Sequence, residues 1–334
     1  MIALAACLTS AAWGTAPEGP RLAVVKWNLL QERHELETVD ATGALPRRLA
    51  GGGERKRPLP ELFEAPSWSP DGSLIAFSGV ARSLEAGFRG NRVYVVGSDG
   101  KGLRRLQGTQ GALQPAFTPD GSAVAFTRSW RRGAGIWLAR LAGGAPRRLT
   151  RARRGVYLLA GSFAPDGRTL VASRFVEGRA LEDVVAVDLS TGKIETLVRR
   201  ASQPVYSPDG TKLALVRWQP LLQRDGNRTF SGDVYTSRAD GSRLRRLTKT
   251  RFQDESFPSW DPSGERLAFV RNLPEPVENE LIELGVGASV VQMNADGTCL
   301  QEILEPSGSA IYGAAWQPGP GREAGRIACG SNSR

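Results

Sequence analysis

Short apolar segments alternate with polar turns along almost the whole chain. Six times an apolar segment runs into a turn built on proline and glycine and continues as a second apolar segment, as in PSWSPDGSLIAFSG from Pro66. The turn prolines are Pro70, Pro119, Pro165, Pro208, Pro262 and Pro318, so successive copies lie 49, 46, 43, 54 and 56 residues apart. A repeat of this length that contains only strands is typical of a radial array of β-sheets.

Each repeat divides into four predicted strands. In the copy that begins at Pro66 we expect them at 66–69, 74–78, 92–96 and 103–106, with a second tight turn at 98–100. Proline presets φ, aspartate caps the turn with its side chain, and glycine accepts the exit geometry. We therefore assign a structural role to the repeated turn residues, which are Pro70, Asp71, Gly72, Pro119, Asp120, Gly121, Pro165, Asp166, Gly167, Pro208, Asp209 and Gly210.

The two ends of the chain complement each other. The first repeat, over 21–49, lacks the first of the four strands, and the last repeat, from Ala314, has that strand and little after it. Joining them completes one blade and closes a ring. The sequence thus predicts an all-β, six-bladed β-propeller of four-stranded antiparallel blades, closed by its N- and C-terminal strands. A strand-like tail at 326–329 has no assigned place.

The unit W-S-P-D-G-x-x-I-A-F, followed by a hairpin with D-G-x-x-L-R-R-L, resembles the PD40 (WD40-like) repeat of TolB-like β-propellers. The resemblance covers nearly everything from Arg21 onward. TolB carries an α/β domain before its propeller, and the hydrolases that share such blades carry a catalytic domain. We expect neither here, and divide the chain into a leader at 1–20 and a propeller at 21–334.

The formal charge of +10 raises the question of nucleic-acid binding. Ten arginines, equal to the whole surplus, form pairs in the last strand of five repeats: Arg47-Arg48, Arg104-Arg105, Arg147-Arg148, Arg199-Arg200 and Arg245-Arg246. Last strands are the outer edges of blades, where charge opposes aggregation. The arginines would ring the circumference rather than form one stripe, so we expect no nucleic-acid partner.

The cysteines bear on location. The apolar start of the chain resembles a signal peptide without its basic region, and Leu4-Ala5-Ala6-Cys7 resembles a lipobox, in which Cys7 would carry lipid. The alternative is a frayed apolar terminus with a chance cysteine. Export predicts the periplasm or the outer cell surface, with membrane attachment only through the lipid anchor. Cys299 and Cys329 then form a possible disulfide, or else two buried free thiols.

The sequence contains little that indicates catalysis. His34 is the only histidine and is expected to be a packing or surface residue; no G-x-S-x-G elbow, metal-ligand pattern or P-loop occurs. We therefore assign no catalytic, cofactor-binding or metal-binding residue.

Specificity is expected on the face that carries the long, irregular loops, because the short turns all lie on the other face. Basic and acidic residues of those loops are the candidate partner residues: Trp130, Arg131, Arg132, Arg153, Arg154, Glu278, Glu280 and Glu283. The sequence favours a monomeric binding scaffold for a protein partner, with a polysaccharide as a second possible ligand. The alternative is an enzyme of the polysaccharide-lyase or cyclase type that uses charged residues in the propeller channel.

Overall fold

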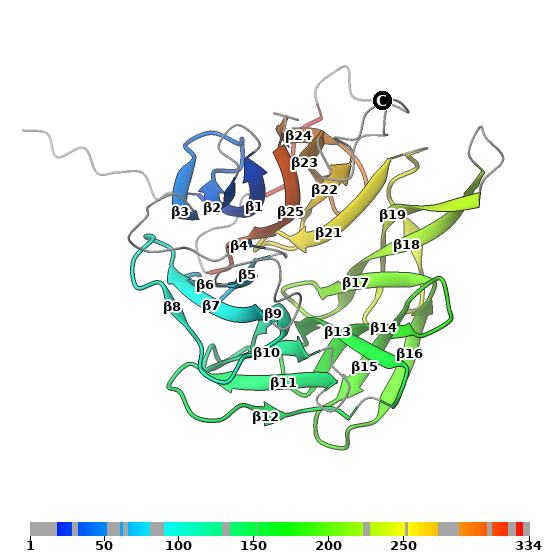
Figure 1. Cartoon of the computed structure of the whole chain (residues 1–334). Coiled ribbons are helices and arrows are strands. Elements are labelled where there is room, and N and C mark those ends of the chain that lie inside the picture. The colour runs from blue at the N-terminus through cyan, green and yellow to red at the C-terminus, as the bar shows by residue number, and fades with distance from the viewer. Residues whose placement is uncertain are drawn as a thin grey trace, which may run out of the picture.

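The computed structural model describes residues 19–28, 33–51, 61–62, 66–80, 90–128, 134–151, 153–222, 228–250, 253–272, 287–305, 309–319 and 325–329. These residues form twenty-five strands in six antiparallel sheets arranged as blades around a common axis (Figure 1). The fold is a six-bladed β-propeller, as predicted. In the described part of the chain, no helix has the length and apolar character needed to cross a membrane.

Three blades follow the regular four-strand order from the inside of the ring to the rim. Blade 3 contains β9 (Ala112–Phe117), β10 (Ala123–Arg128), β11 (Gly135–Arg140) and β12 (Arg147–Arg148). Blade 4 contains β13 (Val156–Phe163), β14 (Thr169–Val176), β15 (Asp183–Asp188) and β16 (Ile194–Arg199). Blade 6 contains β21 (Asp254–Trp260), β22 (Arg266–Asn272), β23 (Ala288–Asn294) and β24 (Gln301–Leu304).

Two blades differ in the number or the length of their strands. In blade 2, two short strands share the inner position, and the strands are β4 (Glu61–Leu62) with β5 (Ser67–Trp68), β6 (Leu74–Val80), β7 (Asn91–Gly97) and β8 (Arg104–Arg105). Blade 5 has unusually long middle strands and contains β17 (Ala201–Tyr206), β18 (Lys212–Leu222), β19 (Arg228–Arg238) and β20 (Arg245–Arg246).

Blade 1 closes the ring. Its inner strand is the C-terminal β25 (Ser309–Trp316), followed by β1 (Leu22–Asn28), β2 (Arg33–Val39) and β3 (Arg47–Gly51). β25 and β1 pair antiparallel along their whole length, from Leu22 with Trp316 to Asn28 with Ser309. The prediction that both ends of the chain build one blade is confirmed.

The apolar positions of the repeat form the core between neighbouring blades. The aromatic residue of the A-F pair in the second strand is fully buried in three blades, as Phe77, Phe126 and Phe269. Phe77 stacks on Tyr94 with 5.7 Å between ring centroids and packs against Val25 and Leu36 of blade 1. Each interface thus joins one blade's second and third strands to the blade before it.

Inner strands bulge, and the bulge amides are bound by the preceding blade. The register shifts once in the middle of β9, β13, β17 and β21. Thr127 Oγ1 accepts a hydrogen bond from the Ala160 amide (2.8 Å), and Ser173 Oγ accepts one from the Gln203 amide (2.8 Å). Gln203 in turn supplies its Oε1 to the Phe257 amide (2.6 Å). These bonds fasten blade 3 to blade 4, blade 4 to blade 5, and blade 5 to blade 6.

The Pro-Asp-Gly turns lie between the first and second strand of a blade. Asp71 accepts hydrogen bonds from Ser69 Oγ (2.6 Å) and the Ser73 amide (3.0 Å), so its carboxylate holds the turn. The turns also touch around the ring, since a Cβ on Gly210 would lie 2.7 Å from Cδ of Pro165 in the preceding blade. The motif therefore joins blades as well as strands.

The paired arginines of the outer strands do more than protect an edge. Arg47 donates to the carbonyl of Asp99 (3.0 Å), and Arg245 donates to the carbonyl of Asp296 (3.0 Å). Both acceptors lie in the turn between the third and fourth strand of the next blade. The first arginine of these two pairs is therefore an inter-blade contact at the rim.

The C-terminal tail packs on blade 6. The Ile327 amide donates to Asn294 Oδ1 (2.8 Å), and Asn294 Nδ2 donates to the Ile327 carbonyl (3.1 Å). Two residues further along the chain, Cys329 forms a disulfide with Cys299, with 4.9 Å between the Cα atoms. That separation is ordinary for a disulfide. The tail thus lies on the turn between β23 and β24.

Gly72 should be more sensitive to substitution than a glycine with the same backbone in open space. Gly72 has a φ of +69°, and a Cβ there would lie 2.5 Å from the carbonyl oxygen of Pro318 at the ring closure. Gly102 has a φ of +67° with nothing within 4 Å of an added Cβ. We expect Gly102→Ala to cost about 1 kcal/mol from backbone strain, and Gly72→Ala to cost roughly 2 kcal/mol more from crowding. Urea unfolding measures both, and equal losses would contradict the contact.

Candidate functional site

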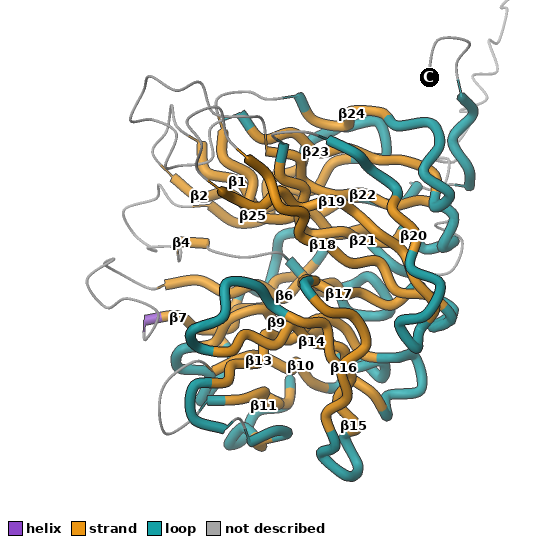
Figure 2. Tube along the Cα trace, turned by 90° about the vertical axis from the view of Figure 1, so that its right-hand side faces the viewer, coloured by secondary structure: helices purple, strands orange, loops and turns teal. Residues whose placement is uncertain are grey.

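The two faces of the ring differ in the connections they carry. Turns between first and second strands, and between third and fourth strands, form the short-turn face. The remaining connections form the long-loop face. Figure 2 shows the ring from its side, with the short turns along the right. Blade order and antiparallel pairing fix this division.

Only part of the predicted partner face lies within the described residues. Arg153 and Arg154 are exposed and lie between β12 and β13 on the long-loop face. Outside the described residues are Trp130, Arg131, Arg132, Glu278, Glu280, Glu283 and Cys7. For those residues the sequence-based expectations remain predictions.

Blade 5 contributes a hairpin arm to this face. One of the long, irregular loops was expected between the second and third strands of this blade. Instead, β18 and β19 each run for 11 residues and pair from Lys212 with Arg238 to Leu222 with Arg228. The ends of these strands project from the ring at the right of Figure 1. Trp218 Nε1 donates to Ser202 Oγ (3.2 Å), which ties the base of the arm to the inner strand β17.

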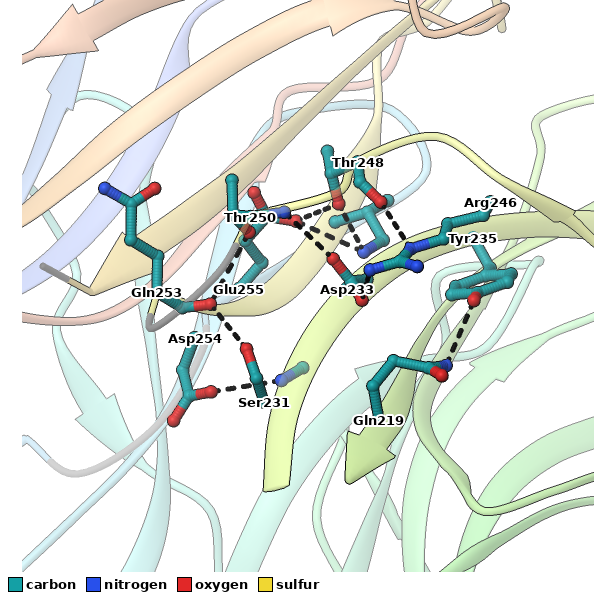
Figure 3. Close-up of polar contacts among 12 residues, drawn as sticks. Gln219, Ser231, Asp233, Tyr235, Arg246, Thr248, Thr250, Gln253, Asp254 and Glu255 are labelled. Atoms are coloured by element: carbon teal, nitrogen blue, oxygen red, sulfur yellow. Dashed lines mark hydrogen bonds and ion pairs between the residues drawn. The ribbon is translucent and has the colours of Figure 1, made fainter. Parts of the chain in front are cut away.

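Buried carboxylates paired with arginine lie at the long-loop end of blades 4, 5 and 6. They are Asp183, Asp233 and Glu255, and their side chains are at most 7% exposed. Figure 3 shows the two that lie at the junction of blades 5 and 6, with Arg246, Thr248 and Thr250 among their polar partners. A buried charge is tolerated only when it is paired and hydrogen-bonded, and each of these three is both.

Glu255 is the most enclosed of them. One of its oxygens, Oε1, accepts from Arg271 Nη2 (2.8 Å) and Nε (3.2 Å). The other, Oε2, accepts from Thr248 Oγ1 and from the Val234 amide (3.3 Å). Glu255 therefore joins the inner strand of blade 6 to the third strand of blade 5.

Asp233 pairs with the outer strand of its own blade. Arg246 Nη2 donates to Asp233 Oδ2 (2.7 Å), and the Thr250 amide donates to Oδ1 (3.3 Å). Burial raises the pKa of the Asp233 carboxyl above its usual value, and the nearby Glu255 charge adds to this, against the opposing effect of Arg246. The pair holds the connection between β20 and β21 against β19.

Asp183 has two arginine partners. Arg174 Nη2 lies 2.9 Å and Arg179 Nη1 3.3 Å from Asp183 Oδ2. Burial acts to raise the pKa of Asp183, but hydrogen bonds from Arg174 and the Arg200 amide, with the two arginine charges, outweigh it and lower the pKa. The carboxylate is therefore ionised and fully engaged.

These pairs position chain segments; they do not assemble an acid and a base around a vacant site. Among the residues that the structure describes, no group of three or more His, Cys, Asp or Glu side chains could hold a metal ion. What the arrangement offers chemically is charge: exposed arginines on the long-loop face, and buried carboxylates that already pair with arginine.

A recurrent arginine is the feature that the sequence analysis missed. The second strand carries an arginine at an equivalent position in blades 3 to 6, namely Arg128, Arg174, Arg217 and Arg271. The sequence carried a signal, because each arginine lies two positions after a buried apolar residue of the same strand. Its meaning depends on what lies opposite in the folded blade, which the repeat alone does not show.

His34 lies on blade 1, surrounded by aromatic residues. Its ring centroid is 4.6 Å from that of Trp27 and 5.4 Å from that of Tyr312, and the residue is 8% exposed. Burial lowers the pKa of His34 from 6.5 to about 4. The expectation of a packing residue fits this position.

These features define the class of the protein by its fold, a six-bladed β-propeller, and solved TolB propellers share that fold. Among solved structures, TolB from Acinetobacter baumannii is similar with a TM-score of 0.67 and 22% identity, over 90% of this chain and 67% of that one. A putative TolB from Agrobacterium tumefaciens is similar with a TM-score of 0.60 and 21% identity, over 89% of this chain and 98% of that one. At these identities the likeness concerns the fold.

Comparison of sequences gives less. An uncharacterized protein of Agrobacterium fabrum is 28% identical over 216 residues, which is 63% of this chain; the match spans 66% of that relative's length. No protein-family model matches the chain.

The Glu255–Arg271 pair should be strongly coupled. We expect Glu255→Gln and Arg271→Met each to destabilise the protein by about 3 kcal/mol, because each leaves a buried partner unpaired. The double variant should cost clearly less than the sum. The exposed pair Lys193–Glu195 is the control, where Glu195→Gln should have almost no effect. Urea unfolding of the four variants tests this, and additive losses for the buried pair would be inconsistent with a direct ion pair.

His34 should remain neutral far below its ordinary pKa. A depressed pKa means that the contribution of His34 to stability is complete above pH 6.5 and is lost as pH falls toward 4, since the unfolded state takes up the proton first. Because the chain has one histidine, its imidazole NMR signals can be followed directly. We expect no titration between pH 7.5 and 5.5, and His34→Phe should flatten the loss of stability below pH 6.5. A midpoint near 6.5 would place the ring in water.

Proposed function

We propose that this chain is a non-catalytic binding scaffold of the bacterial cell envelope that engages a protein partner through its long-loop face. The proposal rests first on a difference in charge and hydrogen bonding between the two faces. On the short-turn face the aspartates of the repeated turns are occupied by turn hydroxyls and amides, as Asp120 is by Thr118 and Ser122. On the long-loop face exposed arginines lie over carboxylates that are already paired.

The observation that carries the proposal is the cluster of exposed arginines on the long-loop side of blades 3 to 5. It comprises Arg151, Arg153, Arg154, Arg179, Arg199 and Arg200. Of these, only Arg179 forms an ion pair with a described carboxylate, Asp183. This surface is mainly positive, with Glu177 as an exposed carboxylate beside Gly155. A mainly positive surface suits a partner of the opposite charge, and favours specificity and rapid association.

Location outside the cytoplasm is part of the same proposal. The lipobox-like sequence before Cys7 and the Cys299–Cys329 bridge support export, because disulfides persist in oxidising compartments. The likeness to the two TolB structures supports a scaffold in the cell envelope. A lipid on Cys7 would then be the means of membrane attachment.

Photo-crosslinking from two positions of one blade tests which face is used. Arg154 and Arg168 are both exposed arginines of blade 4, one before β13 on the long-loop face and the other before β14 on the short-turn face. With a photoreactive residue at either position in living cells, we expect a discrete larger product from position 154 alone. Products of equal yield from both positions, or only from 168, would refute the assignment of the face.

A further inference from the structure

Blades 4 and 5 carry the same arginine and aspartate in the same register, yet pair them differently. Arg174 lies directly opposite Asp183 across β14 and β15, and Arg217 lies directly opposite Asp233 across β18 and β19. In blade 4 the two residues form an ion pair (2.9 Å). In blade 5 the aspartate pairs instead with Arg246 (2.7 Å).

Arg217 is consequently without a carboxylate among the described residues. Its Nε is buried and has no hydrogen-bond partner there, and its guanidinium carbon lies 5.8 Å from the ring centroid of Tyr235. The arginines at the same position of blades 3 and 6 are satisfied, Arg128 by two carbonyls and Arg271 by Glu255. The buried Nε of Arg174 has no acceptor either, so what distinguishes Arg217 is the missing carboxylate, which an acidic ligand would supply.

Two further arginines lie beside Arg217. Ala201 is its partner in the ladder, and the Trp218 amide donates to the Arg200 carbonyl (3.0 Å), so Arg200 is adjacent. Arg199 precedes it at the end of β16. Both are exposed and neither forms an ion pair with a described carboxylate. We call Arg199, Arg200 and Arg217 the blade 4–5 junction site.

The carboxylates at this junction are already engaged. Asp183 is held by Arg174 and Arg179. Glu182 is hydrogen-bonded to Ser202, and burial raises the pKa of its carboxyl in spite of that bond. The three arginines of the site therefore present positive charge to an incoming group.

The side chains of the arm that share a face with Arg217 are polar. Gln219 lies two positions further along β18, and its Nε2 donates to the Tyr235 hydroxyl (3.0 Å). Successive side chains of a strand point to opposite faces, so Trp218, Pro220 and Phe230 lie on the other face of the arm. What the site offers a partner is therefore positive charge with polar neighbours.

We propose that the blade 4–5 junction site binds a carboxylate of an acidic segment of a protein partner, with Arg217 as its anchor. This rests on the proposed function and names the chemistry of the partner. The bound carboxylate would accept from the Arg217 guanidinium and so supply in blade 5 the pairing that Asp183 gives Arg174 in blade 4. A charge-assisted bond in such a shielded position is stronger than one at the open surface.

Peptide binding to the full chain tests the proposal. The probe is a fluorescein-labelled peptide of alternating Glu and Leu, and its control is the same peptide with Gln for Glu, both followed by fluorescence anisotropy near physiological salt. We expect the acidic peptide to bind at least tenfold more tightly, and Arg217→Gln to weaken it at least fivefold. The matched variant Arg105→Gln, which removes the same charge from an exposed position on β8, should change binding less than twofold.

Several outcomes would overturn it. Equal weakening by the two variants would indicate attraction to overall charge, and no preference for Glu over Gln would remove the carboxylate. Displacement of the peptide by polygalacturonate at equal carboxylate concentration would make the partner a polysaccharide.

Folding is controlled separately. Arg217→Gln removes a buried donor without an acceptor, so we expect an unchanged or higher melting temperature. Should it fall, the exposed variant Arg199→Gln must weaken the acidic peptide instead, or the proposal fails. If the crosslink from position 154 persists in Arg217→Gln, the scaffold function stands and this site is wrong.

Discussion

The blades of the ring are joined through backbone amides at the bulges of the inner strands, where an amide points away from its own sheet. A buried amide needs an acceptor, and at three successive junctions the preceding blade provides it: Thr127 for Ala160, Ser173 for Gln203, and Gln203 for Phe257. The bulge residues Gln203 and Phe257 have φ values of +53° and +54°. Such backbone is retained only where the surroundings enforce it, and here the neighbouring blade does so.

The third of these bonds shows how the constraint is met when the repeat varies. Thr127 and Ser173 each lie one position before the recurrent arginine of the second strand, and the equivalent residue in blade 5 is Val216. Valine offers no acceptor, so the Gln203 side chain bonds to the bulge amide of blade 6. The Gln203 amide donates to blade 4, and the Gln203 side chain accepts from blade 6. One residue therefore joins three blades.

Much of this architecture could be predicted from the sequence because its causes are local or follow from counting. The turn at Asp71 depends on hydroxyl and amide groups within two residues, and the closure of blade 1 follows from one strand missing at one end and present at the other. The hairpin arm could not be predicted, since Pro220 and the polar residues after it favoured a loop. Nor could the role of Arg47, whose acceptor at Asp99 is 52 residues away.

The blade 4–5 junction site could not be predicted from the sequence either, because it depends on the identity of one residue in the outer strand. Thr196 pairs with Val185 in blade 4, and Arg246 pairs with Tyr235 in blade 5, so the two occupy equivalent positions. Thr196 Oγ1 accepts a second hydrogen bond from Arg174 (3.0 Å). Because Thr196 is uncharged, it does not compete with Arg174 for Asp183. Arg246 is instead a cation that competes with Arg217, and it forms the ion pair with Asp233. The identity of an outer-strand residue thus decides whether the arginine two strands closer to the axis pairs with the aspartate between them or is left to meet a ligand.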